Sequence, residues 1–259
     1  MDLTDKVAVI TGAASGIGAA CAQAFAARGA RVVVADLNAD GARRVAAEVG
    51  GLAIACNVAE ESAVDALVAE TEHALGPIDV FFNNAGVATG GDPLTTPIPV
   101  WHEQWQINLM SHVYAVRAVL PGMLQRGSGY LLHTASMAGI LTSQGNLTYA
   151  VTKHAVVGLA EWLSITYHDR GIRVSLLAPL GVRTPMLGDV ESAFARNAVG
   201  PIKEPAEVAQ MVVDAIAAER FLILTDPLAQ KWMNNKAADL ERWLNGMRRL
   251  QRTLSEGAG

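Results

Sequence analysis

Cysteine, aromatic residues and charge of either sign are all scarce in this 259-residue sequence. Its two cysteines, Cys21 and Cys56, form no metal-binding or redox motif, so the sequence predicts buried thiols and no metal site. Aromatic residues make up 5% and charged residues 17% of the chain, and its net charge is −5. The absence of a dense basic cluster argues against a nucleic-acid partner.

Long hydrophobic runs are also missing. No apolar run approaches the ~18 residues that indicate a membrane span. The first six residues are acidic and polar, unlike the start of a signal peptide. We therefore expect a soluble, cytoplasmic protein without a membrane partner.

Short β-branched runs alternate with Ala-rich helical segments along the chain. Hydrophobic residues make up 51% of it, a composition that suits a buried parallel sheet covered by helices. The alternation predicts an α/β fold with one doubly wound parallel sheet and helices on both faces, in a single domain over residues 1–259. The expected strands are residues 6–11, 31–36, 51–56, 78–82, 129–134, 171–178 and 221–224.

A glycine-rich turn, Gly12-x-x-x-Gly16-x-Gly18, follows the first expected strand and opens a helix. Glycines let backbone N–H groups at a helix N-terminus approach a pyrophosphate. The spacing differs from the commoner Gly-x-Gly-x-x-Gly fingerprint, so an ordinary strand-to-helix turn is an alternative interpretation of this stretch alone.

Asp36 ends the second expected strand, about twenty residues past the glycines. A carboxylate there can accept hydrogen bonds from the adenosine ribose hydroxyls and would repel a 2′-phosphate. Neither Ser15 nor Leu37 supplies a compensating positive charge. This pattern favours NAD over NADP.

Tyr149 and Lys153 are four residues apart, so on a helix they share one face. An ammonium group beside a phenol lowers the pKa of the phenol, which makes the pair a credible general acid/base. Ser136 lies just past the fifth expected strand. Without further context, the same spacing is more typical of a solvated helix face.

Three further segments carry expectations about packing. Residues 100–124 read as one long helix with Trp101, Trp105, Leu109 and Val113 facing inward. Residues 185–201 have no strong periodicity, which is typical of a mobile lid or a surface insertion. The tail, about 227–254, has an apolar stripe at helical spacing that we expect to pack on the body or on a second subunit rather than on a membrane.

Taken in order, these motifs resemble the short-chain dehydrogenase/reductase family, in its single-domain, NAD-preferring branch. The resemblance covers about residues 3–221 and implies a Rossmann-like sheet with strand order 3-2-1-4-5-6-7. It also implies a homo-oligomer, a tetramer or a dimer. The motifs are Thr11-Gly12-x-x-x-Gly16-x-Gly18, Asn83-Asn84-Ala85-Gly86, Asn108, Ser136 and Tyr149-x-x-x-Lys153.

The resemblance implies a role for each of four catalytic residues. Tyr149 is the acid/base, and Ser136 hydrogen-bonds the substrate oxygen. Lys153 lowers the pKa of Tyr149 and holds the nicotinamide ribose, while Asn108 keeps a helix distorted so that a water can link Lys153 to solvent. The residues expected to contact NAD are Gly12, Ser15, Gly16, Ile17, Gly18, Asp36, Leu37, Asn57, Val58, Asn84, Ala85, Gly86, Tyr149, Lys153, Pro179, Val182 and Thr184.

Two positions depart from the family pattern. Asn57 stands where the family usually has Asp before Val58, and we expect little loss because the amide still forms hydrogen bonds. Leu180 replaces a glycine after Pro179, which alters the pocket near the reacting carbon. The other expected pocket residues carry no charge: Ala88, Thr89, Ala138, Leu141, Met186 and Leu187.

The sequence thus predicts an NAD-dependent oxidoreductase that interconverts a small hydrophobic secondary alcohol and its ketone. A 3-oxoacyl reductase is the alternative within the same class, and Asp36 argues against its usual NADPH. A non-catalytic NAD-binding scaffold is the alternative outside the class, and the intact set of four catalytic residues argues against it.

Overall fold

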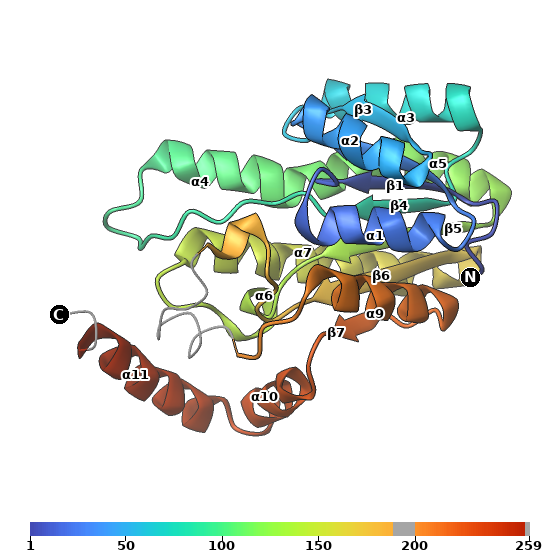
Figure 1. The fold of residues 1–259 in the computed structure, drawn as a ribbon. Coiled ribbons are helices and arrows are strands. Elements are labelled where there is room, and N and C mark those ends of the chain that lie inside the picture. Colours follow the sequence, from blue (N-terminus) through green and yellow to red (C-terminus); the bar gives the residue numbers. More distant parts are fainter. Residues whose placement is uncertain (189–199, 257–259) are drawn as a thin grey trace.

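The structure is a computed structural model that describes residues 1–188 and 200–256. Its centre is a seven-stranded parallel sheet with strand order β3-β2-β1-β4-β5-β6-β7 (Figure 1). This order confirms the topology that the family resemblance implies. The strands are β1 (Val7–Thr11), β2 (Arg31–Asp36), β3 (Leu52–Ala55), β4 (Val80–Asn83), β5 (Gly129–Thr134), β6 (Ile172–Ala178) and β7 (Leu222–Leu224).

Helices cover both faces of the sheet (Figure 1). All five residues of β1 are buried, and successive side chains point to opposite faces. Ala8 and Ile10 therefore join one hydrophobic core, and Val7 and Val9 join the other. One core includes α1 (Gly16–Ala26), α2 (Ala39–Val49) and α9 (Pro205–Ala217), and the other includes α3 (Glu61–Leu75), α5 (Ser111–Arg126) and α7 (Leu147–Tyr167).

The segment expected as one long helix at 100–124 is interrupted. It consists of α4 (Ile98–Trp105), a π-helical turn (Gln106–Met110) and then α5. The π turn widens the helix and shifts the phase of the residues after it. The prediction that four apolar residues spaced by four face inward holds only for Leu109, which packs against the core. Trp105, which precedes the π turn, is 39% exposed, and Trp101 and Val113 are only partly buried.

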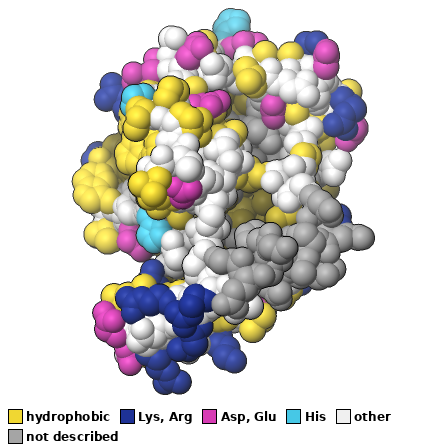
Figure 2. Space-filling model, turned by 90° about the vertical axis from the view of Figure 1, so that its left-hand side faces the viewer, with side chains coloured by type: hydrophobic (Ala, Val, Ile, Leu, Met, Phe, Trp, Pro, Cys, Tyr) yellow, Lys and Arg dark blue, Asp and Glu magenta, His cyan; other side chains and the backbone are white. Residues whose placement is uncertain are grey.

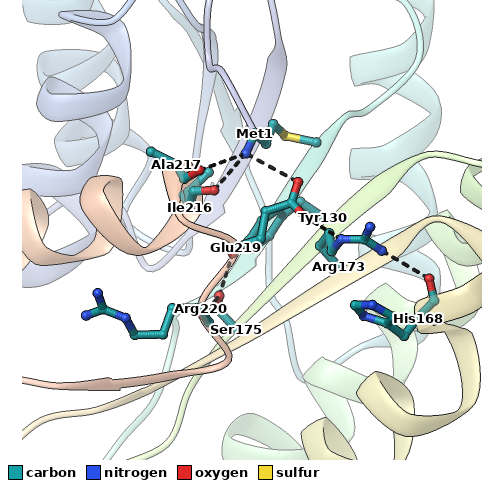
Figure 3. A network of polar contacts seen from close by, with 9 residues as sticks. All are labelled: Met1, Tyr130, His168, Arg173, Ser175, Ile216, Ala217, Glu219 and Arg220. Atoms are coloured by element: carbon teal, nitrogen blue, oxygen red, sulfur yellow. Dashed lines mark hydrogen bonds and ion pairs between the residues drawn. The ribbon is translucent and has the colours of Figure 1, made fainter.

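A polar network at the amino ends of β5 and β6 fastens the start of the chain to the sheet (Figure 3). The Met1 ammonium donates to the Ile216 carbonyl oxygen at 2.8 Å, and Arg173 Nε donates to a Glu219 carboxylate oxygen at 2.5 Å. The Tyr130 and Ser175 hydroxyls lie 2.6 Å apart. This network therefore lies at the end of the sheet opposite the carboxyl ends of the strands.

The chain after β7 forms two helices, α10 (Pro227–Ala238) and α11 (Leu240–Glu256), which run along one side of the molecule past α6 (Ala138–Leu141) (Figure 1). Of the expected lid at 185–201, Pro185–Leu187 form a short 3-10 turn, and residues 189–199 lie outside the described residues. Among the described residues, no helix combines the length and the apolar character needed to span a membrane.

Candidate active site

A cavity of about 760 Å³ lies at the carboxyl ends of the strands. Two of the predicted site residues, Gly18 and Asn108, do not line it, and nor does Thr89 of the expected pocket. The predicted residues that do line it are Gly12, Ser15, Gly16, Ile17, Asp36, Leu37, Asn57, Val58, Asn84, Ala85, Gly86, Ala88, Ser136, Ala138, Leu141, Tyr149, Lys153, Pro179, Leu180, Val182, Thr184, Met186 and Leu187.

The glycine-rich turn presents bare backbone to this cavity. Gly12 and Gly16 have φ values of +64° and +56°, which disfavour any larger residue. A Cβ on Gly12 would lie 2.8 Å from the Ala85 Cα, and a Cβ on Gly18 would lie 2.4 Å from the Gly12 carbonyl oxygen. Gly18 is thus a packing position beneath the turn. Ser15 makes no side-chain cap at the start of α1, so the first N–H groups of the helix can receive an anion.

Asn84 joins the ends of three strands. Its Nδ2 donates to the Thr11 carbonyl oxygen at 3.0 Å, and its Oδ1 accepts from Thr134 Oγ1 at 3.2 Å. Asn83, its neighbour in sequence, points into the sheet core and has an Nδ2 atom without a hydrogen-bond partner among the described residues. Asn84, and not Asn83, therefore ties the strand ends together.

Asp36 lies beside the glycine-rich turn. Its Oδ2 accepts from the Ala14 N–H at 2.9 Å and its Oδ1 from the Asn38 N–H at 2.9 Å. Arg44 also reaches this turn, donating from Nη2 to the Ala14 carbonyl oxygen at 3.1 Å, and it forms a 3.0 Å ion pair with Glu48. Sequence reasoning missed this cation because it comes from the second turn of α2, not from a residue beside Asp36.

Helix α7 brings the catalytic candidates together. Lys153 Nζ lies 5.7 Å from the centre of the Tyr149 ring and donates to the Thr134 carbonyl oxygen at 2.8 Å. Ser136 follows β5, and its hydroxyl lies near enough to that of Tyr149 to favour the phenolate. Gly86 leaves room for this group, since a Cβ there would lie 3.3 Å from Lys153 Nζ.

Burial changes the acidity of both helix residues. It lowers the pKa of Lys153 to about 7. It raises the pKa of Tyr149, and the Ser136 hydroxyl opposes that rise. The expected lowering of the Tyr149 pKa by Lys153 is thus not found in this structure, because desolvation of the phenolate is the larger effect and a lysine with a pKa near 7 is only partly charged.

Asn108 lies behind the cavity, in the π-helical turn, so the expected helix distortion is present there. Its Oδ1 accepts from the Val87 N–H at 2.8 Å, and its Nδ2 donates to Thr152 Oγ1 at 3.1 Å. Gln104, one turn earlier, donates to Thr148 Oγ1 at 2.7 Å. Sequence reasoning missed Gln104, although a polar pair at i and i+4 within an apolar helix could have indicated a buried polar face.

The sequence profile described as short chain dehydrogenase matches residues 6–194. The chain belongs to the short-chain dehydrogenase family. This confirms the resemblance inferred from the ordered motifs.

Two curated relatives of this chain are dehydrogenases. The chain is 36% identical over 251 residues to 1-deoxy-11-beta-hydroxypentalenate dehydrogenase of Streptomyces exfoliatus, an alignment that covers 93% of this chain and 90% of the relative. It is 38% identical over 224 residues to 2,5-dichloro-2,5-cyclohexadiene-1,4-diol dehydrogenase of Sphingobium indicum, covering 82% and 90%.

Two similar solved structures hold a nicotinamide cofactor. One is a short-chain dehydrogenase/reductase from Burkholderia phymatum in complex with NAD, at 29% identity, a TM-score of 0.86, and coverage of 93% of this chain and 96% of that chain. The other is 3-ketoacyl-(acyl-carrier-protein) reductase from Brucella melitensis complexed with NADH, at 29% identity, a TM-score of 0.80, and coverage of 86% and 96%.

Within this short-chain dehydrogenase fold, the tail also lines the cavity. Trp232 of α10 and Trp243, Met247 and Leu250 of α11 all face it. The sequence prediction placed this apolar stripe on the body or on a second subunit. Its position over the cavity could not be read from periodicity, because a 3.6-residue period identifies a buried face but not the surface that covers it.

Proposed function

We propose that this chain is an NAD-dependent oxidoreductase that interconverts a hydrophobic secondary alcohol and its ketone. The observation that carries the proposal is the meeting of Tyr149, Ser136 and Lys153 at one cavity, whose far end holds the glycine-rich turn and Asp36. Proton-transfer groups and a dinucleotide cradle in one cavity are what hydride transfer needs.

The residues present fit a dinucleotide. The turn at Gly12 and Gly16 is a backbone cradle that a Cβ would fill, and the uncapped start of α1 suits a pyrophosphate. Asp36 faces the same turn and suits ribose hydroxyls. We assign Gly12, Ser15, Gly16, Ile17 and Gly18 to the pyrophosphate turn, Asp36 and Leu37 to the ribose, Asn57 and Val58 to the adenine, and Asn84, Ala85, Gly86, Pro179, Val182 and Thr184 to the nicotinamide half.

The chain's own residues move the proton. In the oxidative direction Ser136 Oγ hydrogen-bonds the substrate hydroxyl, and Tyr149 accepts its proton as the C–O bond becomes a carbonyl. This step needs the Tyr149 phenolate, which burial disfavours and the Ser136 hydroxyl favours. The chemistry that NAD would supply when bound is that of a hydride acceptor for the carbinol carbon. Lys153, with a pKa near 7, exchanges the proton onward, and Asn108 holds the π turn beside it open for a water.

A 3-oxoacyl reductase is the second candidate, because one similar solved structure is such an enzyme complexed with NADH. The residues around the cavity favour the first candidate. Among the described residues that line it, the charged ones are Asp36 and Lys153, both assigned to cofactor and catalysis. The scaffold alternative is disfavoured, since the four catalytic candidates are intact and lie at or directly behind the cavity.

The test is a spectrophotometric screen of secondary alcohols with NAD, repeated with NADP. We expect formation of NADH with apolar alcohols and weaker activity with NADP. Turnover of 3-oxoacyl thioesters with no oxidation of simple alcohols would favour the second candidate. Cofactor binding without turnover of any carbonyl or alcohol would favour the scaffold.

We also propose that the chain forms a homo-oligomer, a dimer or a tetramer. Five large apolar side chains on α4 and α7 are exposed: Ile98 at 64%, Trp105 at 39%, Val151 at 37%, Trp162 at 57% and Ile165 at 82%. Exposed apolar residues of this size on two helices are typical of a subunit contact. Sedimentation of the wild type and of a Trp162→Glu/Ile165→Glu variant tests this, and a monomeric wild type would contradict it.

A further inference from the structure

We infer that α10 and α11 build a substrate subsite for a bulky apolar ring system, and that Leu180 holds this subsite over Tyr149. The inference rests on the proposed function and specifies its substrate class. The inference rests on the part of the cavity wall that the tail supplies. This part consists of Trp232, Trp243, Met247 and Leu250.

Helix α11 has an apolar face and a basic face, and this difference decides which face turns towards the cavity. Trp243, Met247 and Leu250 follow one another at three- and four-residue spacing, so they form one stripe. The opposite face carries Arg242, Arg248, Arg249 and Arg252, all exposed. Figure 2 shows Lys and Arg side chains gathered at the end of the molecule where α11 lies. Solvation of the arginines therefore keeps the apolar stripe directed at the cavity.

The apolar stripe is not fully covered by the protein. Trp232, Trp243, Met247 and Leu250 are each only partly buried, whereas a stripe that served the core alone would be closed off from the solvent. Apolar surface of this kind inside a cavity is the usual lining of a site for an apolar ligand. The indole ring of tryptophan is large and rigid. It can therefore cover much of the surface of a flat or alicyclic ring skeleton.

Leu180 connects the catalytic edge of the sheet to this wall. It follows Pro179 at the end of β6, and its N–H donates to Thr225 Oγ1 at 3.1 Å. Its side chain packs in a cluster with Trp232 and Trp243. The glycine that the family pattern has at this position would remove this large side chain from the cluster, leaving Ala178 as its contact to β6. Leu180 is thus a positioning residue for the tail.

A second tie holds α10 in place. Lys236 Nζ donates to the Ile140 carbonyl oxygen on α6. Helix α6 also contributes Leu141, five residues after Ser136 in the chain, to the cavity wall. The subsite therefore keeps a fixed distance from the serine that holds the substrate oxygen. A substrate with its carbinol carbon at Tyr149 places its remaining bulk against the two tryptophans.

The experiment compares kcat/KM for a small alcohol, 2-propanol, with that for a bicyclic alcohol, a decalol, using NAD. We expect Trp243→Ala to lower kcat/KM for the decalol by about tenfold more than for 2-propanol, mainly through KM. Leu180→Gly should act in the same direction and less strongly. The matched control is Leu240→Ala, on the same helix but 52% exposed and outside the cavity lining, which should change both values less than about twofold.

Equal losses for the two alcohols in Trp243→Ala, or a loss in Leu240→Ala as large, would overturn the subsite. The conservative Trp243→Phe should retain most of the discrimination, and circular dichroism melting checks that each variant is folded. Binding of decalone, followed by quenching of tryptophan fluorescence, tests the subsite without turnover. A wild type that binds decalone but oxidises no alcohol would contradict the proposed function alone, while turnover of 2-propanol without decalone binding would contradict the subsite alone.

Discussion

The cofactor end and the substrate end of the cavity are lined by different kinds of residue. The cofactor end consists of backbone and small side chains that lie within a few residues of a strand end, such as Gly12, Gly16 and Gly86. The substrate end consists of large side chains from segments far apart in the chain, such as Leu141, Leu180 and Trp243. Their separation in sequence is the main difference between the two ends.

That difference decides how much change each end tolerates. A Cβ on Gly12 would lie 2.8 Å from the Ala85 Cα, so almost any substitution there displaces the turn. An apolar wall can be rebuilt from other side chains of similar total volume. The first end is therefore recognisable as a short motif. The second end has no motif, and only the folded chain shows which residues form it.

The largest effect is expected at Tyr149, where the two ends meet. Tyr149→Phe removes the proton acceptor but keeps the ring, so turnover should fall by about 10³-fold or more. NADH binding, measured by fluorescence, should change less than about twofold, because neither end has lost its contacts. Tyr114→Phe is the control, since its hydroxyl donates to Gln106 Oε1 at an exposed site. Turnover near wild type in Tyr149→Phe would refute its catalytic role.

The next effect concerns a buried pair of histidines outside the cavity lining. His112 and His133 are fully buried, and their Nδ1 atoms lie 2.9 Å apart. Burial lowers the pKa of His112 well below 6.5 and that of His133 to about 3. The unfolded chain takes up protons at these histidines as pH falls through 6.5, whereas the folded chain does not. Stability should therefore be lost as pH falls from 6.5 towards 3.

The loss should amount to about 2 kcal/mol per histidine between pH 6.5 and pH 5. Denaturant unfolding at several pH values measures it. Replacing both residues together, His112→Leu/His133→Leu, should flatten the dependence in this window, because two apolar side chains leave no unpaired partner. The exposed His73→Leu is the matched control. A double variant as acid-sensitive as the wild type would show that other groups control this window.

Much of the fold and of the cofactor end follows from the sequence, for a physical reason. A strand buried on both faces is mostly apolar, as β1 is from Val7 to Ile10, and a close backbone approach must use glycine, as at Gly12. The family resemblance implies a distorted helix at Asn108, but residue spacing alone could not give the interruption of the 100–124 segment, because it depends on Asn108 bonding to Val87 and Thr152 across the fold. The raised pKa of Tyr149 likewise depends on burial that only the folded structure sets.

A smaller effect should be confined to the cofactor end. Asp36→Ala removes the carboxylate that would repel a 2′-phosphate, while Arg44 remains beside the same turn. The ratio of kcat/KM for NAD to that for NADP should fall by about tenfold. The preference for decalol over 2-propanol should stay unchanged, which would separate the two ends experimentally. Asp40→Ala, at a nearby exposed carboxylate paired with Arg43, is the control. An unchanged cofactor ratio would refute the role of Asp36.

The smallest effect is expected at Asn57, the cofactor-end position that departs from the family pattern. Its Oδ1 accepts from the Ala59 N–H at 3.2 Å, and its Nδ2 donates to Glu60 at 2.7 Å. Asn57→Asp keeps the acceptor but sets two carboxylates side by side, and at an exposed site that repulsion is weak. The KM for NAD should change less than about threefold in steady-state assays. A change of tenfold or more would mean that this side chain reads the adenine directly, so that the cofactor end depends on a side chain as strongly as the substrate end does.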